Sequence, residues 1–367
     1  MKLAIVCDDL VQFGGQERLV VAVHDIWPDA PIYTSVASKK WIAYAKEHSV
    51  KLVTSFMQKL PFVDSLNRFY SILLFHILAM ESFDFSDYDV VLSFSSRFAH
   101  GVITKPSTKH VCYMNSPGRM FWEPAGYFDH ERVDGGWLAL PILWMRFWSY
   151  IAAQRVDLFI ANSRSIKSKI EKYYKRDAIV VYPFADICLR TDTKNSVSDY
   201  FLVVTRLAAW KRVDVAIAAC IKCGVKLKIV GVGRDMPRLK RISGSNPNIE
   251  FLGQVGDERK TELLLGCQAL INTQAEDFGI VPIEAMFCGK PVIAYGFGGA
   301  LETVQAGITG EFFCEQTAES LLKVLTAFDY RKYSQSNCVL QARNFSRQLY
   351  ERNLKQVIRT VYLGVQN

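Results

Sequence analysis

The sequence predicts an α/β protein made of two domains, each with a parallel β-sheet covered by helices on both faces. First, its 367 residues exceed what one ordinary core needs and suit two domains. Second, short apolar runs alternate with amphipathic segments along nearly the whole chain, as in repeated strand–helix units. Third, this alternation breaks once, at the polar stretch Ala185–Tyr200, which follows Pro183 and is the best linker candidate.

The apolar runs define the expected strands. In the first half they are Lys2–Cys7, Pro31–Thr34, Val90–Ser93, Lys109–Tyr113, Leu158–Ile160 and Ile179–Tyr182. In the second half they are Phe201–Thr205, Lys226–Val230, Ile249–Leu252, Ala269–Asn272 and Pro291–Tyr295. The clearest helical patterns cover Val213–Cys223, Thr317–Asp329 and Phe345–Leu363. We therefore expect a first domain over residues 1–185, a second over 186–344, and a C-terminal helix over 345–367 that packs back on the first domain.

Composition indicates a globular protein. The chain is 50% hydrophobic and 22% charged, and its nine cysteines form no disulfide framework, which favours a reducing cytoplasm. Cys220 and Cys223 form one C-x-x-C pair, but no second pair lies at zinc spacing, so we expect no metal site. The net charge of +8 comes from dispersed basic residues. It indicates a polyanion or an acidic membrane surface only weakly, and we expect no nucleic-acid partner.

Two apolar stretches bear on membrane contact. The segment Tyr70–Met80 is too short to span a bilayer, and Pro141 and Arg146 interrupt the longer segment Gly136–Ala153. The simpler interpretation of the longer segment is a buried helix. The alternative is a surface at the headgroup level, which its aromatic and basic residues keep open: Trp137, Trp144, Trp148 and Arg146. A peripheral association with the inner face of a membrane is therefore an expectation.

Ligands of such sheets bind at the carboxyl ends of the strands, where loops meet helix N-termini. Gly14 and Gly15 follow the first strand, and paired glycines let a ligand approach the backbone and the next helix closely. Arg206 and Lys211 follow the strand at 201–205, and two cations five residues apart suit a diphosphate. Taken alone, each motif also fits a purely structural turn or a solvated loop.

A glycine turn follows the strand at 226–230. Gly231 and Gly233 stand in the first two positions of a dinucleotide-binding G-x-G-x-x-G fingerprint, but Met236 replaces the last glycine. This departure argues against a nicotinamide-dependent oxidoreductase. Gly233 nonetheless marks a strand end at the expected ligand side of the sheet.

The most informative segment is the string EDFGIVPIE at residues 276–284. Pro282 suits the first turn of a helix, which places Glu284 near the helix start and Glu276 on the preceding loop. A carboxylate there can accept both hydroxyls of a ribose. The N–H groups of Phe278, Gly279 and Ile280 can hold phosphate or sugar oxygens. A structural alternative for Glu284 is a favourable interaction with the helix dipole.

A last segment, YMNSPGRMFW at 113–122, follows a strand of the first domain and also fits an ordinary Ser-Pro-Gly turn. Taken together, these residues resemble retaining glycosyltransferase family four. The E-x7-E string is Glu276 to Glu284, the R-x4-K element is Arg206 and Lys211, and the Gly-Gly-x-Glu loop is Gly14–Glu17. The chain looks closest to the mannosyltransferase-like branch that builds bacterial surface polysaccharides, through residues 83–96 and 113–122.

The resemblance implies the GT-B fold, in which two Rossmann-like domains face each other across a cleft. It implies a metal-independent, retaining transfer of a hexose, guessed to be mannose, with no cofactor. The donor would be GDP-mannose or a UDP-sugar, and the acceptor a glycan or a polyprenyl-linked oligosaccharide. Donor-binding residues would be Gly14, Gly15, Arg206, Lys211, Gly233, Phe278, Gly279, Ile280 and Glu284.

The resemblance also implies catalytic roles for Arg206, Lys211, Glu276 and Asn115, and an acceptor side at Asn115, Arg119 and Trp122. Asn115 stands where the family has a histidine that contacts the sugar, and an asparagine carries no proton near neutral pH. A non-catalytic nucleotide-sugar-binding subunit of a synthase complex therefore stays open as an alternative. A nucleotide-sugar epimerase is disfavoured, because epimerases lack the matched R-x4-K and E-x7-E pair.

Overall fold

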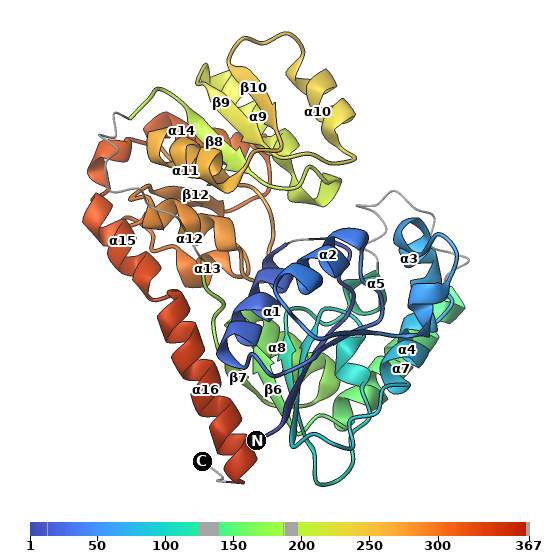
Figure 1. The fold of residues 1–367 in the computed structure, drawn as a ribbon. Coiled ribbons are helices and arrows are strands. Elements are labelled where there is room, and N and C mark those ends of the chain that lie inside the picture. The colour runs from blue at the N-terminus through green and yellow to red at the C-terminus, as the bar shows by residue number, and fades with distance from the viewer. Residues whose placement is uncertain (13, 125–138, 186, 188–196, 365–367) are drawn as a thin grey trace. The chain divides into compact units, whose positions relative to one another are not determined.

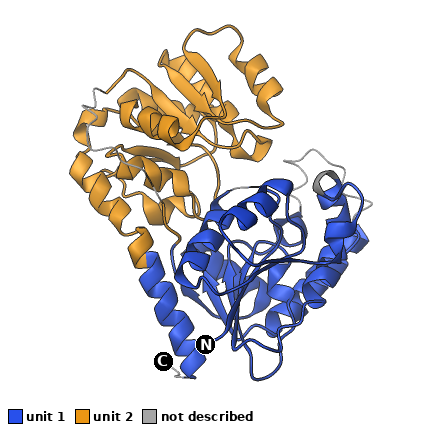
Figure 2. Ribbon diagram, viewed as in Figure 1, with its two compact units in different colours: residues 1–182, 350–367 blue, residues 183–349 orange. Residues whose placement is uncertain are grey.

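A computed structural model describes residues 1–12, 14–124, 139–185, 187 and 197–364 (Figure 1). The chain forms two compact units, residues 1–182 with 350–367, and residues 183–349 (Figure 2). The predicted boundaries at 185/186 and 344/345 lie close to these divisions. Most of the predicted linker Ala185–Tyr200 lies outside the described residues.

The first unit contains a seven-stranded sheet in the order β3-β2-β1-β4-β5-β6-β7, and every pairing in it is parallel. Its strands are β1 (Leu3–Cys7), β2 (Ile32–Thr34), β3 (Leu52–Thr54), β4 (Val90–Ser95), β5 (Lys109–Met114), β6 (Leu158–Ala161) and β7 (Ala178–Val180). Its helices and 3-10 turns are α1 (Gly15–Ile26), α2 (Lys39–Glu47), η1 (Phe56–Lys59), α3 (Val63–Ile72), α4 (Phe75–Glu81), η2 (Ala99–Gly101), α5 (Arg119–Trp122), α7 (Ala139–Gln154) and α8 (Arg164–Tyr174).

The second unit contains a six-stranded parallel sheet in the order β10-β9-β8-β11-β12-β13. Its strands are β8 (Phe201–Val204), β9 (Leu227–Val230), β10 (Ile249–Gly253), β11 (Leu270–Asn272), β12 (Val292–Tyr295) and β13 (Gly310–Phe313). Its helices and 3-10 turns are η4 (Ala209–Lys211), α9 (Val213–Cys223), α10 (Met236–Ser243), α11 (Asp257–Gly266), α12 (Ile280–Phe287), α13 (Ala300–Thr303), α14 (Ala318–Ala327), η5 (Tyr330–Lys332) and α15 (Gln335–Arg343).

The predicted α/β class with two parallel, Rossmann-like sheets is confirmed. The strands β3 and β13, which are short and lie at the sheet edges, were not predicted from the sequence. β3 is only partly buried along its length, so it lacks the apolar run that marks a central strand. β13 begins at Gly310, where a Cβ would meet the Val292 carbonyl oxygen at 1.9 Å, so a glycine stands where an apolar side chain would have marked the strand.

The C-terminal helix α16 (Arg347–Leu363) carries the chain back to the first unit, which includes residues from Tyr350 onward. Tyr350, Leu354 and Ile358 lie on one face of the helix and are buried. The Tyr350 ring packs edge-on against Tyr113 of β5, with ring centroids 6.1 Å apart. This spacing of apolar residues is what makes one face of α16 adhere to the first unit.

Both sheets reverse their strand order at one point, between β1 and β4 in the first unit and between β8 and β11 in the second. In open parallel sheets the loops leaving the carboxyl ends of the strands separate at such a switch point and leave a crevice for ligands. These two switch points therefore locate the candidate sites, one in each unit.

Candidate functional site

The loops after β8 and β11 meet at the switch point of the second unit. The Thr205 hydroxyl donates to the Gln274 side-chain carbonyl at 3.0 Å, and the Thr273 hydroxyl donates to the Lys211 carbonyl at 2.9 Å. These two bonds tie the R-x4-K loop to the end of the neighbouring strand. Thr273 and Gln274 were not among the site residues predicted from the sequence.

Lys211 and Glu276 form an ion pair at this point. The Lys211 ammonium donates to Glu276 Oε1 and lies 4.0 Å from the centre of the Trp210 ring, which adds a cation–π contact. Both side chains are largely withdrawn from water, with exposed fractions of 9% and 18%. The structure thus brings together the cation predicted for the diphosphate and the carboxylate predicted for the transferred sugar.

Arg206 lies at the end of β8 and is exposed. Within the described part of the chain its side chain makes no hydrogen bond or ion pair, so its guanidinium is available to a ligand. The two predicted phosphate-binding cations therefore differ in their surroundings. Lys211 is fixed by a carboxylate, whereas Arg206 has no such anchor.

A pair of glycines after β12 holds the loop that carries Glu276. The Gly299 N–H donates to the Glu276 carbonyl at 2.9 Å, and Gly298 forms an isolated parallel bridge with Glu276. A Cβ at Gly298 would meet the Glu276 carbonyl oxygen at 2.2 Å, and a Cβ at Gly299 would meet Phe278 Cα at 2.2 Å. Only glycines allow this close packing.

Gly279 ends that loop and is the N-cap of α12, with a φ of 87° that favours glycine. The Phe278 ring is buried against Phe345 at a centroid distance of 5.7 Å, so only its backbone remains for a ligand. Ile280 begins the helix, and its N–H is one of the first-turn donors that lack an intrahelical acceptor. These backbone groups fit the predicted role of Phe278, Gly279 and Ile280 in binding oxygens.

Glu284 lies inside α12 and is buried, with its carboxylate 2.8 Å from the Lys260 ammonium of α11. Lys260 also lies 3.3 Å from Asp257. The carboxylate predicted for the ribose is therefore already paired, and a ribose would have to share or displace Lys260. Lys260, which lies 24 residues earlier on another helix, was not predicted from the sequence.

Gly231 and Gly233 serve the packing of β8 against β9. A Cβ at Gly231 would meet the Thr205 carbonyl oxygen at 1.8 Å, and one at Gly233 would meet the Leu207 carbonyl oxygen at 2.1 Å. The space where a Cβ of Gly233 would lie is filled by the backbone of Leu207. The predicted contact of Gly233 with the donor would therefore have to come from its own backbone atoms.

In the first unit, Gly14 and Gly15 begin α1 at the switch point beside β1. The Gly14 N–H donates to Glu17 Oε2 at 2.9 Å, so this carboxylate closes the first turn of the helix. Glu17 is buried, and burial raises its pKa to about 7. One backbone donor of the Gly-Gly loop is thus already used within the protein.

Asp8 and Asp9 follow β1 directly and were not identified as site residues. Asp8 accepts from the four backbone N–H groups of residues 96–99, at 2.6–2.9 Å, which fixes the loop after β4 against the end of β1. Burial raises the pKa of Asp8, and Arg97 opposes that rise. Asp9 pairs with Arg97 and accepts from Asn67 at 2.7 Å. The sequence did offer a sign of these site residues, because two adjacent acids follow the first apolar run directly.

Asn115 lies at the carboxyl end of β5. Its N–H donates to the Ser95 carbonyl at 2.8 Å and its carbonyl accepts from Asn162 at 3.0 Å, so the backbone is fixed on both sides. The side-chain nitrogen Nδ2 is buried and has no hydrogen-bond partner among the described residues. A buried donor without an acceptor is costly, which suits a position that a ligand oxygen completes.

Arg119 and Trp122 lie on the short helix α5. The Trp122 ring stacks on Tyr173 at 4.9 Å, and its Nε1–H donates to the Ser149 hydroxyl at 3.3 Å. Trp122 therefore packs towards α7 and α8. Arg119 is partly buried.

The described residues contain no group of three or more His, Cys, Asp or Glu side chains arranged to hold a metal ion. No helix in the described ranges is both long and apolar enough to cross a membrane.

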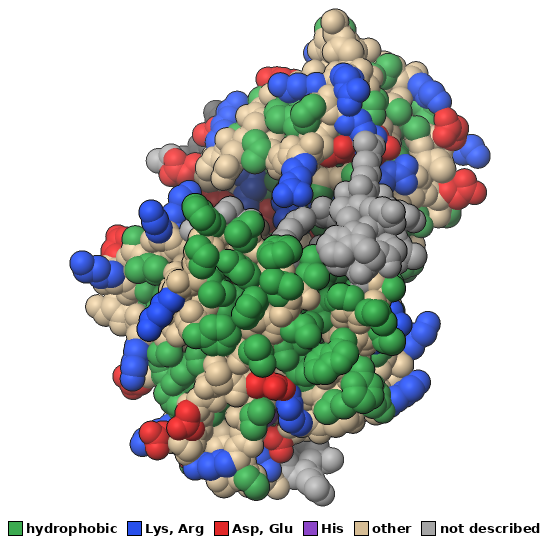
Figure 3. Space-filling view, turned by 90° about the vertical axis from the view of Figure 1, so that its right-hand side faces the viewer, with side chains coloured by type: hydrophobic (Ala, Val, Ile, Leu, Met, Phe, Trp, Pro, Cys, Tyr) green, Lys and Arg blue, Asp and Glu red, His purple; other side chains and the backbone are tan. Residues whose placement is uncertain are grey.

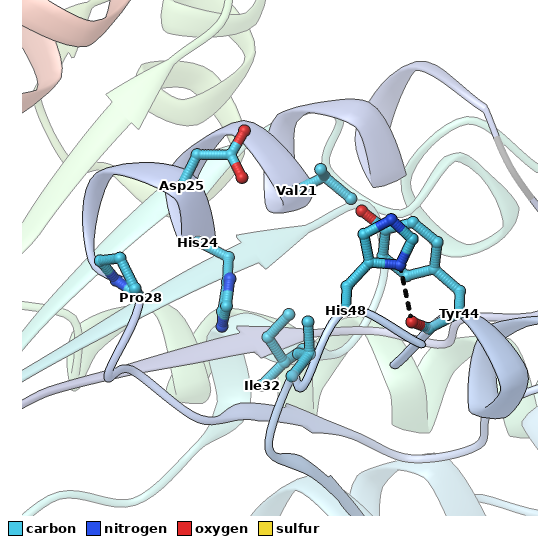
Figure 4. Close-up of a pocket in the computed structure, with 8 residues that line it drawn as sticks. Val21, His24, Asp25, Pro28, Ile32, Tyr44 and His48 are labelled. Atoms are coloured by element: carbon cyan, nitrogen blue, oxygen red, sulfur yellow. Dashed lines mark hydrogen bonds between the residues drawn. The ribbon is translucent and has the colours of Figure 1, made fainter. Parts of the chain in front are cut away.

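An open surface pocket of about 330 Å³ lies between α1 and α2, near the amino ends of β2 and β3 (Figure 4). There the His48 ring stacks on Tyr44 at 4.1 Å. Within the first unit this pocket lies towards the amino ends of the strands, whereas the predicted site residues of that unit follow the carboxyl ends.

Parts of the sequence are similar to known glycosyltransferases. Residues 190–344 match the model of the family Glycosyl transferases group 1. The chain is 47% identical over 77 residues to alpha-1,3/1,6-mannosyltransferase ALG2 of Dictyostelium discoideum, covering 21% of this chain and 18% of that protein. It is 30% identical over 274 residues to ALG2 of Saccharomyces cerevisiae, covering 55% of this chain and 54% of that protein. The chain thus spans about half or less of the length of these relatives.

Solved structures match over nearly the whole chain. Anabaena HepE in complex with UDP and glucose has a TM-score of 0.70 at 18% identity, covering 98% of this chain and 100% of that one. Sucrose-phosphate synthase from Thermosynechococcus elongatus has a TM-score of 0.73 at 14% identity, covering 99% and 100%. At these identities the likeness establishes the fold. The sequence of residues 190–344 is therefore similar to the family Glycosyl transferases group 1, and the chain has the two-sheet fold of these solved structures.

Proposed function

We propose that this protein is a retaining glycosyltransferase that moves a hexose from a nucleotide-diphosphate sugar to a glycan or a polyprenyl-linked oligosaccharide. The observation that carries the proposal is the Lys211–Glu276 pair at the switch point of the second sheet, with Arg206 five residues before Lys211 on the same loop. This arrangement lies inside residues 190–344, which match the family Glycosyl transferases group 1. It presents cations for a diphosphate next to a carboxylate for a sugar.

The diphosphate would bind to Arg206 and to Lys211. Glu276 pairs with Lys211 in the structure, so a bound diphosphate would compete with this carboxylate for the ammonium. The exchange would leave Glu276 close to the diphosphate, where its oxygens can accept hydroxyls of the attached hexose. The N–H groups at the start of α12 supply further donors to negatively charged oxygens.

Glu284 would accept the ribose hydroxyls, as the family resemblance implies. Because its carboxylate is buried and paired with Lys260, its ribose contact requires the ammonium to move aside or to share one oxygen. A carboxylate has two oxygens and about four acceptor positions, so sharing is chemically reasonable. We therefore add Lys260 to the donor site as a positioning residue.

The proposed sugar is mannose, because two of the relatives are named mannosyltransferases. The proposed donor is GDP-mannose or a UDP-sugar; the HepE structure, whose ligands are UDP and glucose, supports a nucleotide-sugar donor. We propose that the reaction needs neither a metal ion nor a further cofactor. Asn115, with its unpaired amide nitrogen, and Arg119 would lie on the acceptor side.

The proposed chemistry is attack on the face of the sugar from which the diphosphate leaves. The bond between the anomeric carbon and the diphosphate oxygen breaks, and a bond from this carbon to the acceptor oxygen forms. The acceptor proton moves to the leaving diphosphate. Arg206, Lys211 and backbone N–H groups stabilise the negative charge on the leaving group, and losing one such fixed donor typically costs a factor of about 10²–10³ in rate.

One observation favours a second candidate function, a nucleotide-sugar-binding subunit without transferase activity. Asn115 stands where the family has a histidine near the reacting centre, and asparagine cannot exchange a proton near neutral pH. Such a subunit would bind the donor and transfer nothing. The two candidates therefore agree on donor binding and differ on product.

The test measures the melting temperature with GDP-mannose, UDP-glucose, UDP-galactose, UDP-N-acetylglucosamine and dTDP-rhamnose. A ligand that binds the native state at a hundred times its Kd adds about 2.7 kcal/mol of stability. We expect one nucleotide sugar to raise the melting temperature, and Lys211→Ala or Glu284→Ala to abolish that rise. Lys222→Ala is the matched control, because Lys222 forms an exposed ion pair on α9. A folded protein that no nucleotide sugar stabilises would refute the proposal.

A further inference from the structure

Helix α7 is apolar on both its buried and its exposed faces. Ile142, Met145 and Trp148 point into the core of the first unit. The outward positions are also apolar, and Leu140, Trp144 and Phe147 expose 78%, 58% and 63% of their surface. A surface helix normally presents charged or polar residues to water. The exposed side of α7 therefore lacks the composition of a water-facing surface.

Helices α3 and α4 extend the same apolar surface. The buried faces of α4 and α7 share one core, in which Ile77 and Met80 pack with Met145. The Trp148 Nε1–H also donates to Glu81 at the end of α4, at 3.0 Å. We call the exposed apolar side chains of these elements the α3–α7 face. They are Phe62, Leu66, Phe69, Leu73, Leu78, Leu140, Leu143, Trp144, Phe147, Tyr150 and Ile151.

Figure 3 shows this face as one broad field of hydrophobic side chains on the first unit. Since a large apolar or aromatic side chain carries roughly 150–250 Å² of surface, the partly exposed members together offer on the order of 1,000 Å² to solvent. The largest apolar patch of an ordinary monomer covers about 300–600 Å². A face of this size indicates an interaction surface.

The charges around the face are suited to an anionic surface. Arg146 is the single charged residue of α7; it is half-buried, and its Nε donates to the Phe121 carbonyl at 2.8 Å. Lys59, on η1 beside α3 and α4, is exposed. Glu81 is already neutralised by Arg155 at 2.7 Å. In Figure 3, Lys and Arg side chains lie on both sides of the hydrophobic field, and Asp and Glu side chains lie at its lower border. The whole chain has a net charge of +8.

We propose that the α3–α7 face docks the protein onto a lipid bilayer that contains anionic headgroups. α7 lies in the plane of the interface, with Trp144, Phe147 and Tyr150 in the headgroup region and the cations against the phosphates. With sixteen residues, α7 is too short to span a bilayer. The inference goes beyond the proposed transfer reaction and does not depend on it.

The experiment is co-sedimentation of the full chain with vesicles of phosphatidylcholine alone, and with vesicles containing one third phosphatidylglycerol. We expect binding to the mixed vesicles, weaker binding to phosphatidylcholine, and a reduction of binding at high salt. The double variant Trp144→Ser/Phe147→Ser should lower the partition coefficient at least about tenfold, since it removes two large apolar side chains from the bilayer. The control Leu340→Ser, at an exposed leucine of α15, should leave binding unchanged.

A second measurement detects bilayer contact on the wild-type protein itself. Lipids with brominated acyl chains should quench the tryptophan fluorescence of the wild-type protein, and Trp144→Phe should remove most of that quenching. Failure of the wild type to bind the mixed vesicles would overturn the proposal. So would equal binding by the double variant. A soluble oligomer that the double variant dissociates, with no vesicle binding, would also overturn it and assign the face to contact between copies of this chain.

Discussion

The Lys211–Glu276 pair gives the sharpest prediction about how the second unit is built. Lys211→Met removes the ammonium and leaves a mostly buried carboxylate without its cation. Glu276→Gln removes the negative charge instead, and the double variant Lys211→Met/Glu276→Gln removes both charges. A buried carboxylate or ammonium that loses its partner still carries its desolvation cost. We therefore expect each single variant to be less stable than the wild type by more than the loss of one ordinary hydrogen bond.

The magnitude follows from the geometry. Two unit charges at 4 Å near a protein surface attract with about 4 kcal/mol, and breaking a buried pair by removing one partner costs about 3–5 kcal/mol. Glu276 keeps 18% of its side chain exposed, so we take the lower end. We predict a loss of about 3 kcal/mol for Lys211→Met, with part of this loss recovered in the double variant.

The assay is urea unfolding of the wild type, both single variants and the double variant, which gives the coupling free energy of the cycle. The Lys222–Glu319 pair is the control cycle, since both side chains are more than half exposed and such pairs contribute about 0–1 kcal/mol. A coupling free energy below about 0.5 kcal/mol between Lys211 and Glu276 would refute the reasoning. The pair would then contribute little to the stability of the second unit.

Three further predictions concern single residues. Glu17 has a pKa raised to about 7, so between pH 4.5 and pH 7 the folded protein keeps a proton that the unfolded chain has lost. This stabilisation is complete below the ordinary pKa of 4.5 and is lost as the pH rises through 7. The unfolding free energy of the wild type minus that of Glu17→Gln should therefore fall by about 2.5 kcal/mol from pH 5 to pH 8. Gly299→Ala should destabilise the protein by about 1–3 kcal/mol and weaken donor binding, because the added Cβ would meet the backbone at 2.2 Å. Gly296→Ala, whose Cβ has its nearest contact at 3.5 Å, should do neither. Equal effects of the two variants in thermal melts would contradict this prediction. Lys260→Met should cost about 3 kcal/mol by isolating the buried carboxylate on α12, and Arg259→Met, which breaks an exposed pair, should change the unfolding free energy by less than about 0.5 kcal/mol.

The fold was accessible from sequence because its strands are buried on both faces. β1 and β4 are buried at every position, so they appear as unbroken apolar runs separated by helical patterns. The edge strands lack this signature. β3 is partly exposed, and only its pairing with β2 reveals it as a strand.

The motif residues were accessible because they are close in sequence. Arg206 and Lys211 lie on one loop, and Glu276 and Glu284 on one loop and its helix. Contacts between distant segments were not accessible. Lys260 reaches Glu284 from another helix, and no local pattern records that approach.

Some missed residues did carry a signal. Gly298 and Gly299 stand between β12 and the next helix, as Gly14 and Gly15 stand at the start of the helix after β1. A close approach of the backbone could therefore have been predicted for both glycine pairs. What the sequence could not show is which backbone they approach. Likewise, the apolar exposed side of α7 depends on which face the core covers, and a helix that is apolar all round gives no periodicity to indicate it.

The most direct test of the proposed function is product formation. The purified protein is incubated with GDP-mannose or a UDP-sugar and polyprenyl-diphosphate-linked oligosaccharides, and the product is analysed by mass spectrometry and by NMR of its anomeric proton. We predict the addition of one hexose with the anomeric configuration of the donor, and a rate at least about a hundredfold lower for Lys211→Ala. A donor that stabilises the protein without any glycoside product would contradict transferase activity and favour the binding subunit. A product of inverted configuration would contradict the retaining mechanism.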